Sequence, residues 1–202
     1  MGEDRVYFKS GELTLEGLFA PSAGTKGAVI AHPHPLMGGS MRDNVVVTLV
    51  ALFQQNRFST FRFNFRSVGR SEGLYDDGAG EAEDLLAAIQ FLSGQGVEDL
   101  SVAGYSFGAL MAVKCLALTK DIGFTILISP PLGEAGISFR NLAGRKGLIV
   151  CGDMDPFCPI DEFKKAAGEA MWPHETVKGA DHFYFGKETA LMEIIGKHLK
   201  TG

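Results

Sequence analysis

The 202-residue chain lacks several features that mark whole classes of protein. It has only three cysteines, Cys115, Cys151 and Cys158, an odd number without the spacing of a zinc site, so we expect buried thiols in a reducing compartment. It also lacks a basic excess, because 24 acidic residues outnumber 19 lysines and arginines and give a net charge of -5. This charge argues against a nucleic-acid partner, since binding to phosphates usually needs a basic surface.

Long apolar runs are missing too. The longest apolar stretch with helical spacing, 45–53, is only about half the length of a membrane span. The first residues, MGEDRVYFK, have neither the basic start nor the apolar core of a signal peptide. These observations predict a cytoplasmic protein with no membrane partner, and no feature of the sequence points to a particular oligomeric state.

Glycine, in contrast, is abundant, with 26 residues in 202, where an average protein has roughly 7%. The glycines follow no fixed period, which excludes a collagen-like chain and indicates many tight or left-handed turns. The length suits one domain, residues 1–202, able to bury roughly 70% of the surface of the unfolded chain. No internal repeat and no linker rich in Pro, Gly or Ser divides it.

Short apolar or alternating segments are interleaved with segments of helical spacing along most of the chain. The expected strands are 5–9, 13–19, 26–32, 59–65, 100–104, 124–129, 146–151 and 175–178, and the expected helices are 45–53, 82–92, 107–118, 160–170 and 191–199. The first two strands should form an antiparallel hairpin. Strands separated by helices predict an α/β fold with a mostly parallel sheet covered on both faces. Ligands bind beyond the carboxyl ends of such strands, so the residues just after each strand are candidates for chemistry.

The motif GxSxG occurs twice, around Ser71 and around Ser106. Around Ser71 a polar loop follows the motif, which indicates an ordinary loop serine. Around Ser106 the motif joins an apolar strand to a helical run, which is the context of a nucleophile elbow. Glycines 104 and 108 would allow the sharp turn, and the helix N-terminus would favour developing negative charge at the serine. The alternative is that Ser106 only caps that helix.

A serine nucleophile needs a base, and the base needs an acid that orients it. Of the five histidines, His182 has the best position, because it follows the last strand and precedes the last helix. His174 and His198 are expected at the surface. His32 and His34 follow the third strand, ahead of any candidate nucleophile in the chain.

Two carboxylates compete for the role of the acid after the apolar strand 146–151. Asp155 is favoured, because Pro156 makes the backbone rigid directly after it, whereas Asp153 could instead cap the turn. Asp181 is adjacent to the base in sequence, so its side chain should point elsewhere and serve a structural role.

The order Ser106, Asp155, His182, each after a strand, resembles the α/β-hydrolase superfamily. The likeness covers nearly the whole chain, with AHPHPLMGGSM, FNFRSVGRSEG, GYSFGA, GDMDPFCP and GADHF as its motifs. More narrowly, the chain resembles the small, capless, dienelactone-hydrolase-like branch, whose members carry HPHP followed by GG and Met. This resemblance implies a single-domain α/β-hydrolase fold with helices on both faces of the sheet and little or no cap. Dienelactone hydrolases proper use a cysteine nucleophile where this chain has serine, so their substrate is not carried over.

The resemblance also implies an oxyanion hole made by the backbone N–H groups of His34 and Phe107. Many members of the superfamily have His-Gly after the third strand, where this chain has His32-Pro33. Proline has no N–H, so neither Pro33 nor Pro35 can donate there.

These residues predict a serine hydrolase of carboxylesterase or thioesterase type that acts on a small acyl substrate without a cofactor. The acyl-enzyme intermediate would form on Ser106. Residues 130–145 leave little room for the helical lid that many relatives insert, which predicts a shallow, exposed site for short-chain esters, thioesters or accessible peptides. Candidates for an apolar rim are Met37, Leu132, Phe157 and Phe183, together with Phe107, although each could equally belong to the core.

Two other classes of function are considered. His32 and His34, with Asp153, Asp155 and His182 at the same edge of the sheet, could form a metal-dependent hydrolase. The prolines around His34 and the absence of further ligand spacing argue against a metal site. A non-catalytic binding module on a hydrolase scaffold is the other alternative, because a fold does not fix a function.

Overall fold

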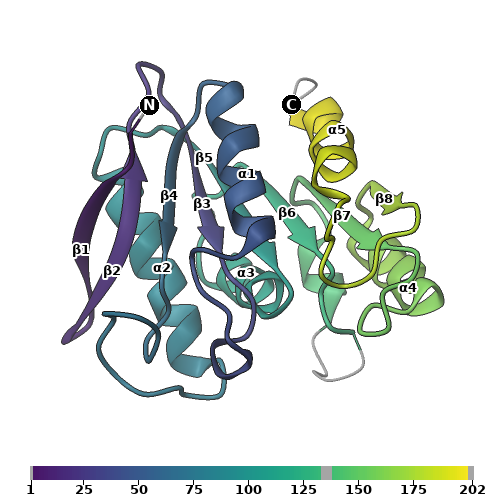
Figure 1. Ribbon diagram of the computed structural model, residues 1–202, viewed down its shortest axis with the longest axis horizontal. Coiled ribbons are helices and arrows are strands. Elements are labelled where there is room, and N and C mark those ends of the chain that lie inside the picture. Colours follow the sequence, from purple (N-terminus) through teal and green to yellow (C-terminus); the bar gives the residue numbers. More distant parts are fainter. Residues whose placement is uncertain (1, 133–137, 200–202) are drawn as a thin grey trace.

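Eight strands form one sheet in the computed structural model, which describes residues 2–132 and 138–199 (Figure 1). The strands are β1 (Asp4–Ser10), β2 (Leu13–Ala20), β3 (Lys26–Ala31), β4 (Ser59–Phe63), β5 (Asp99–Tyr105), β6 (Phe124–Ile128), β7 (Gly147–Gly152) and β8 (His174–Val177). The helices are α1 (Asn44–Gln55), α2 (Ala79–Ser93), α3 (Phe107–Leu118), α4 (Ile160–Ala170) and α5 (Glu188–Leu199), with short 3-10 helices at Pro35–Met37 and Phe139–Leu142. The strand order is β1-β2-β4-β3-β5-β6-β7-β8.

The direction of the strands brings the candidate residues to one edge. β1 and β2 form the expected antiparallel hairpin, and β2 pairs antiparallel with β4. From β3 to β8 every pairing is parallel. The carboxyl ends of these six strands therefore share one edge of the sheet, which is the lower edge in Figure 1. The predicted fold class is confirmed.

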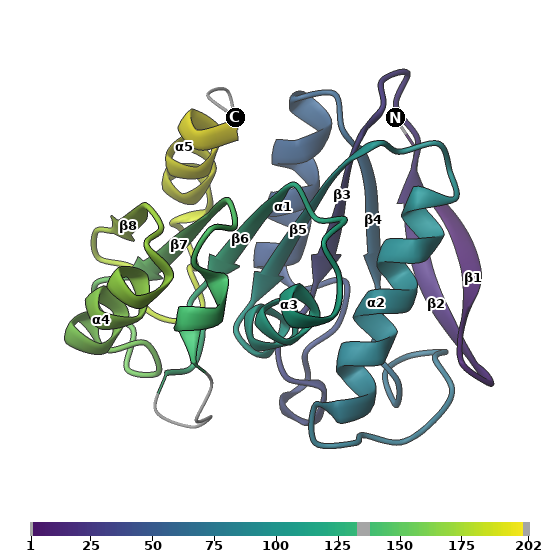
Figure 2. The same cartoon turned by 180° about the vertical axis from the view of Figure 1, so that it is seen from behind.

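Helices cover both faces of the sheet and enclose two apolar clusters. α1 and α5 lie on the face seen in Figure 1, and α2, α3 and α4 lie on the face seen in Figure 2. Successive side chains of a strand point to opposite faces, so along β3 Ala28 and Ile30 join the first cluster while Val29 and Ala31 join the second. A strand buried on both sides therefore appears in the sequence as a continuous apolar run.

The expected elements differ from the observed ones mainly at their ends. The fourth expected strand, 59–65, ends at Phe63, and the backbone N–H of Asn64 still donates to the carbonyl oxygen of Glu16 in β2 at 3.0 Å. The side chain of Asn64 accepts from the N–H of Met41 at 2.8 Å and donates to Glu16 at 2.8 Å. The next N–H, that of Phe65, donates to Nε2 of His32 at 3.1 Å and not to a neighbouring strand, so the strand stops before the end of its alternating pattern.

Several expectations from composition agree with the structure. Nine glycines of the segments 2–132 and 138–199 have a positive φ, as the glycine excess indicates. All three cysteines are buried and free. Within residues 2–132 and 138–199 no helix has the length and apolar character needed to cross a bilayer. Residues 133–137 of the short connection 130–145 lie outside the described residues, and its described parts contain only the 3-10 helix Phe139–Leu142.

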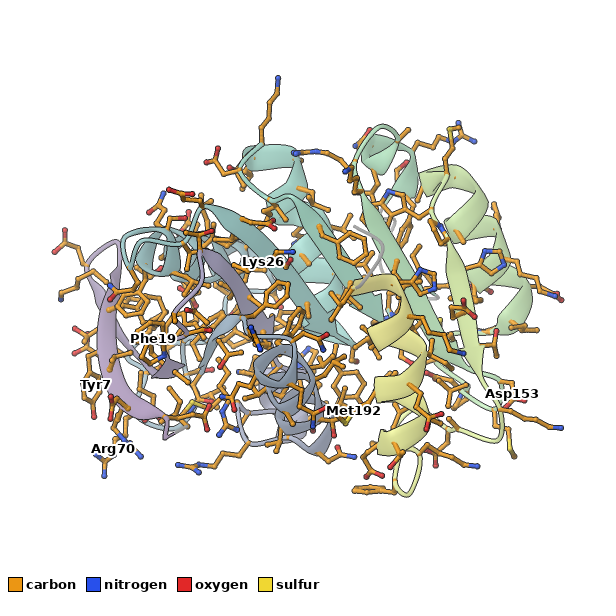
Figure 3. All side chains as sticks on the ribbon, turned by 90° about the horizontal axis from the view of Figure 1, so that it is seen from above. Tyr7, Phe19, Lys26, Arg70, Asp153 and Met192 are labelled. Carbon is orange, nitrogen blue, oxygen red and sulfur yellow. The ribbon has the colours of Figure 1, made fainter. Side chains whose placement is uncertain are left out.

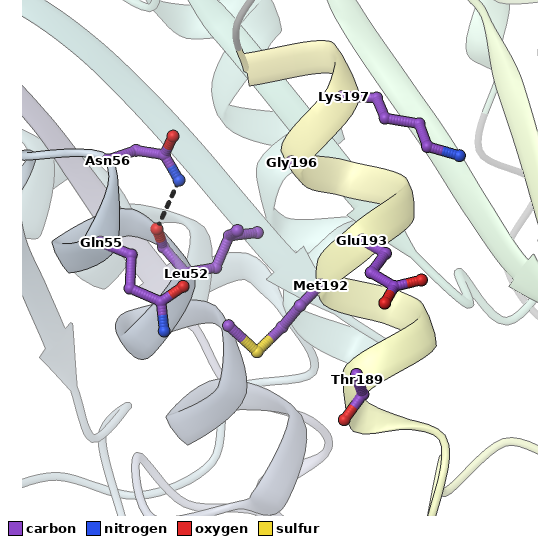
Figure 4. A pocket seen from close by; sticks show the side chains of 8 residues that line it. All are labelled: Leu52, Gln55, Asn56, Thr189, Met192, Glu193, Gly196 and Lys197. Atoms are coloured by element: carbon purple, nitrogen blue, oxygen red, sulfur yellow. Dashed lines mark hydrogen bonds between the residues drawn. The ribbon is translucent and has the colours of Figure 1, made fainter.

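A hollow of about 590 Å³ lies between α1 and α5, away from the carboxyl ends of the strands (Figure 4). Leu52 and Met192 form its apolar floor, and the polar side chains of Gln55, Glu193 and Lys197 surround it. It contains none of the candidate catalytic residues.

Candidate active site

Ser106 lies at a strained turn between β5 and α3. Its φ of 55° is in the left-handed region, which is unusual for a residue other than glycine. A Cβ atom on Gly104 would lie 2.3 Å from the carbonyl oxygen of Gly108, and a Cβ atom on Gly108 would lie 2.4 Å from that of Ala31. Both positions of the motif therefore require glycine, and the turn that the motif predicts around Ser106 is present.

Ser106, His182 and Asp155 form a continuous chain of hydrogen bonds. The Nε2 atom of His182 lies 2.9 Å from the Oγ atom of Ser106, and its Nδ1 atom lies 2.9 Å and 3.0 Å from the two carboxyl oxygens of Asp155. The carboxylate can only accept a hydrogen bond, so the proton of the neutral imidazole lies on Nδ1. Nε2 is then free to accept the hydroxyl proton of the serine, as a general base must.

The loop after β7 holds the carboxylate of Asp155 in an ionised state. Its Oδ1 atom accepts hydrogen bonds from the N–H groups of Phe157 at 2.9 Å and Cys158 at 3.2 Å. Burial alone would raise the pKa of Asp155, but hydrogen bonds from His182 and Ser129 outweigh burial and lower the pKa below its ordinary value. The side chain is thus a buried anion at neutral pH, directed at the imidazole.

The neighbouring carboxylates serve local turns. Asp153 is exposed, and its Oδ1 atom accepts from the N–H of Gly179 at 2.6 Å. In Figure 3 it lies at the β8 end of the sheet, far from the labelled Tyr7 at the β1 end. The Oδ1 atom of Asp181 accepts from the N–H of Phe183 at 2.9 Å. The structure therefore brings Asp155 to the histidine, whereas Asp153 and Asp181 hold the loops on either side.

Three residues that the sequence analysis does not single out support this arrangement. The hydroxyl of Tyr105 donates to the carbonyl oxygen of His182 at 2.6 Å and so holds the backbone of the base. The hydroxyl groups of Ser129 and Tyr184, both fully buried, lie 2.8 Å apart. Ser129 directly follows β6 at the carboxyl edge, which is a signal that could have identified it. The tyrosines give no such signal, because buried aromatic residues normally belong to the core.

The two residues implied for the oxyanion hole line the same cavity as Ser106. Among the described residues no hydrogen bond engages the backbone N–H of His34 or of Phe107, the first residue of α3. The imidazole of His34 accepts from the N–H of Leu36 at 3.2 Å and lies 3.1 Å from the hydroxyl of Tyr75, and its ring centroid is 4.9 Å from that of Phe107. These contacts hold the loop after β3 against the start of α3.

A cavity of about 690 Å³ opens beside Ser106 and His182. Of the rim candidates, Met37, Phe107, Phe157 and Phe183 line it.

Leu132, the remaining candidate, is half-buried and packs against the apolar cluster beneath α2, α3 and α4, and it is not among the described residues that line the cavity. Its N–H donates to the carbonyl oxygen of Phe157 at 3.1 Å, which ties this segment to the loop after β7.

His32 is a buried structural histidine. It is fully buried, its Nδ1 atom lies 2.6 Å from the carbonyl oxygen of Pro33, and its Nε2 atom accepts from the N–H of Phe65 at 3.1 Å. Burial lowers the pKa of His32 from 6.5 to about 4, so the ring is neutral and both nitrogens are occupied. In residues 2–132 and 138–199 no group of three His, Cys, Asp or Glu side chains converges as a metal site would require. The donor set that motivated the metal hypothesis is therefore not assembled.

Ser71, the serine of the other GxSxG motif, is also structural. It lies in a loop, as expected, but is buried there. Its hydroxyl donates to the carbonyl oxygen of Asn64 at 2.7 Å and accepts from the N–H of Glu16 at 3.1 Å.

Comparison with known proteins places the chain among relatives of the same size. No family model matches the sequence. An uncharacterized protein of Rickettsia prowazekii, RP471, is 30% identical over 211 residues, which cover 98% of this chain and 89% of that protein.

Solved structures show the same likeness. A putative α/β hydrolase of unknown function from Agrobacterium tumefaciens, ATU1826, is 35% identical with a TM-score of 0.89, and the match covers 98% of this chain and 94% of that one. An α/β serine hydrolase homologue from Coxiella burnetii is 32% identical with a TM-score of 0.90 and covers 98% of each chain. XC6422 from Xanthomonas campestris, an α/β serine hydrolase without a lid, is 24% identical with a TM-score of 0.88 over 100% of this chain and 95% of that one, which shows the fold alone.

The sheet, its flanking helices and these relatives define the class of the protein, which is an α/β hydrolase. Within that class, the chain belongs to the family that includes RP471 and the Agrobacterium tumefaciens protein. The similarity to these proteins supports a hydrolase activity for the chain.

Proposed function

We propose that the protein is a serine hydrolase that cleaves a carboxylic ester or a related acyl bond of a small molecule. The observation that carries this proposal is the unbroken chain of hydrogen bonds from Ser106 through His182 to Asp155 beside an open cavity. A serine that only caps a helix does not require a buried imidazole nitrogen 2.9 Å from its Oγ atom or an ionised carboxylate bonded to that imidazole.

In the proposed reaction the Oγ atom of Ser106 attacks the substrate carbonyl while Nε2 of His182 takes its proton. The imidazolium, stabilised by Asp155, gives that proton to the leaving alcohol or thiol as the acyl-enzyme forms. Water then attacks the acyl group with His182 again as the base, and the carboxylic acid is released. The N–H groups of His34 and Phe107 would bind the oxyanion, a contribution of about 3 kcal/mol per donor in enzymes where such donors have been removed.

The cavity sets the class of substrate that we propose. Its volume of about 690 Å³ lies within the range of roughly 300–1,000 Å³ typical of small-molecule sites. Apolar side chains such as Met37, Leu110 and Phe157 line it, so an acyl group of modest size would bury apolar surface there. We therefore propose a carboxylesterase or thioesterase without a cofactor. We also propose a cytoplasmic location, in keeping with the three free thiols.

A panel of p-nitrophenyl esters and thioesters tests this proposal. We expect at least one activated ester to give a rapid burst of one p-nitrophenol per protein molecule, followed by slower turnover, because the acyl-enzyme accumulates. Ser106→Ala should abolish the burst and the turnover, whereas Ser71→Ala, whose folding is checked by its melting temperature, should keep both.

Two other results of the panel would contradict the proposal. A folded wild-type protein that gives neither burst nor turnover with any compound would favour a binding module on a hydrolase scaffold. Turnover that is lost on chelation and restored by zinc or manganese would favour a metal-dependent reaction.

A further inference from the structure

Exposed apolar side chains surround the mouth of the cavity. Met37 is 85% exposed, Phe185 73%, Leu36 65%, Phe183 52% and Phe157 48%. From here on, the apolar rim means these five exposed residues, three of which (Met37, Phe157 and Phe183) are among the rim candidates predicted from the sequence. They account for five of the eleven large apolar side chains that are exposed in the described part of the chain, so they are concentrated at one place.

The rim residues come from three loops at the carboxyl edge that border one cavity. Met37, Phe157 and Phe183 line the same cavity, and Leu36 adjoins Met37 in the 3-10 helix after β3. The rings of Phe183 and Phe185 are stacked with their centroids 6.2 Å apart and an interplanar angle of 17°.

The catalytic base lies within this rim. The ring of His182 lies 4.8 Å from that of Phe157 and 5.8 Å from that of Phe183. The apolar surface therefore begins at the candidate base and spreads outward into solvent.

Single exposed apolar residues are common, but a contiguous exposed group usually marks an interaction surface. The position of the rim restricts what can cover it. A folded protein or a second copy of the chain seated on all three loops would close the cavity and block access to Ser106. An assembly of ester lipid can cover the rim and also supply the substrate, because individual molecules can move from it into the cavity.

The charges near the mouth indicate which kind of lipid surface fits. The charged side chains that line the cavity are two acids, Asp43 and Asp77, and one base, Lys114. Asp153 and Asp181 are exposed on the loops that follow β7 and β8, and Arg42 and Lys178 are exposed on the loops that follow β3 and β8. These side chains include no basic excess that would attract an anionic interface, so an uncharged or zwitterionic one is the better match.

We infer that the apolar rim adsorbs to an uncharged or zwitterionic lipid interface and that the cavity takes apolar esters from it. This inference rests on the proposed hydrolase function and adds the physical state of the substrate. The site then acts on assembled, poorly soluble esters as well as on soluble ones.

The test uses a double variant of two rim residues that do not line the cavity, Leu36→Ser with Phe185→Ser. The matched control is Leu118→Ser with Tyr7→Ser, which removes one exposed leucine and one exposed aromatic ring far from the mouth, at the end of α3 and on β1. Binding to phosphatidylcholine vesicles is measured by cosedimentation. Turnover is measured with soluble p-nitrophenyl acetate and with tributyrin below and above its solubility limit.

We expect the wild type and the control variant to bind the vesicles and to turn over tributyrin faster once droplets form. The rim variant should bind the vesicles about tenfold more weakly, because less apolar surface leaves water on binding. Its rate of tributyrin turnover should not rise when droplets form. Its turnover of p-nitrophenyl acetate should match that of the wild type.

The inference is overturned if the wild type does not bind the vesicles, if the rim and control variants bind equally, or if vesicles rich in phosphatidylserine bind better. It is also overturned if the rim variant changes only the oligomeric state, which would make a second copy the occupant. In each of these cases normal turnover of p-nitrophenyl acetate would leave the proposed function intact. Absence of turnover with every ester would instead count against the proposed function itself.

Discussion

Replacing Asp155 with asparagine should lower kcat roughly 10⁴-fold while the protein stays folded. An asparagine oxygen can still accept from the N–H groups of Phe157 and Cys158, so its amide NH₂ would face the imidazole of His182. The imidazole would then place its proton on Nε2, where it can no longer take the proton of Ser106. The measurement is kcat for p-nitrophenyl acetate, together with the melting temperature.

Asp153→Asn is the control for this prediction, because it makes the same change two residues away. Asp153 accepts from the N–H of Gly179 and touches no reacting group, so its variant should keep kcat within about threefold of the wild type. If kcat falls equally in the two variants, or falls further in Asp153→Asn, the assignment of Asp155 as the acid is wrong.

Gly108→Ala should destabilise the fold by about 3 kcal/mol and remove most of the activity. Its new Cβ atom would lie 2.4 Å from the carbonyl oxygen of Ala31 and 2.7 Å from that of His32, so the first turn of α3 must move away from β3. That movement carries Ser106 away from His182. Urea unfolding gives the loss of stability, and ester turnover gives the loss of activity.

Gly168→Ala provides the comparison for Gly108→Ala, because both glycines lie within helices. A Cβ atom on Gly168, in α4, would have no atom within 4 Å, so alanine should raise the free energy of unfolding by roughly 0.5–1 kcal/mol. If the two variants unfold at the same urea concentration, the close approach of α3 to β3 does not constrain the elbow.

Local patterns were sufficient to predict most of the fold and the principal candidate residues. The alternation of strands and helices follows from periodicity, and the turn at Ser106 follows from two glycines that are near each other in sequence. The choice between Asp155 and Asp153 also had a local basis, since Pro156 comes directly after Asp155. In the structure the carboxylate of Asp155 faces the histidine, which agrees with that preference.

Features that depend on how distant loops pack together could not be predicted. The contact of Ser129 with Tyr184 joins residues 55 positions apart, and the bond from Tyr105 to His182 joins residues 77 apart. Leu132 is apolar like the other rim candidates, and its packing against the cluster beneath α2, α3 and α4 depends on the tertiary fold. The apolar rim was anticipated only in part, because the exposure of Leu36 and Phe185 depends on how two loops that are distant in sequence pack, and the local sequence does not show it.

The central claim is that Ser106 is a nucleophile activated by His182 and Asp155, and covalent labelling tests it most directly. The wild-type protein is treated with a fluorophosphonate probe, and the modified residue is located by peptide mass mapping. We expect one probe per molecule, attached to the peptide that contains Ser106, with labelling abolished by Ser106→Ala and retained in Ser71→Ala. Labelling that survives in Ser106→Ala, or a probe found on Ser71, would contradict this claim.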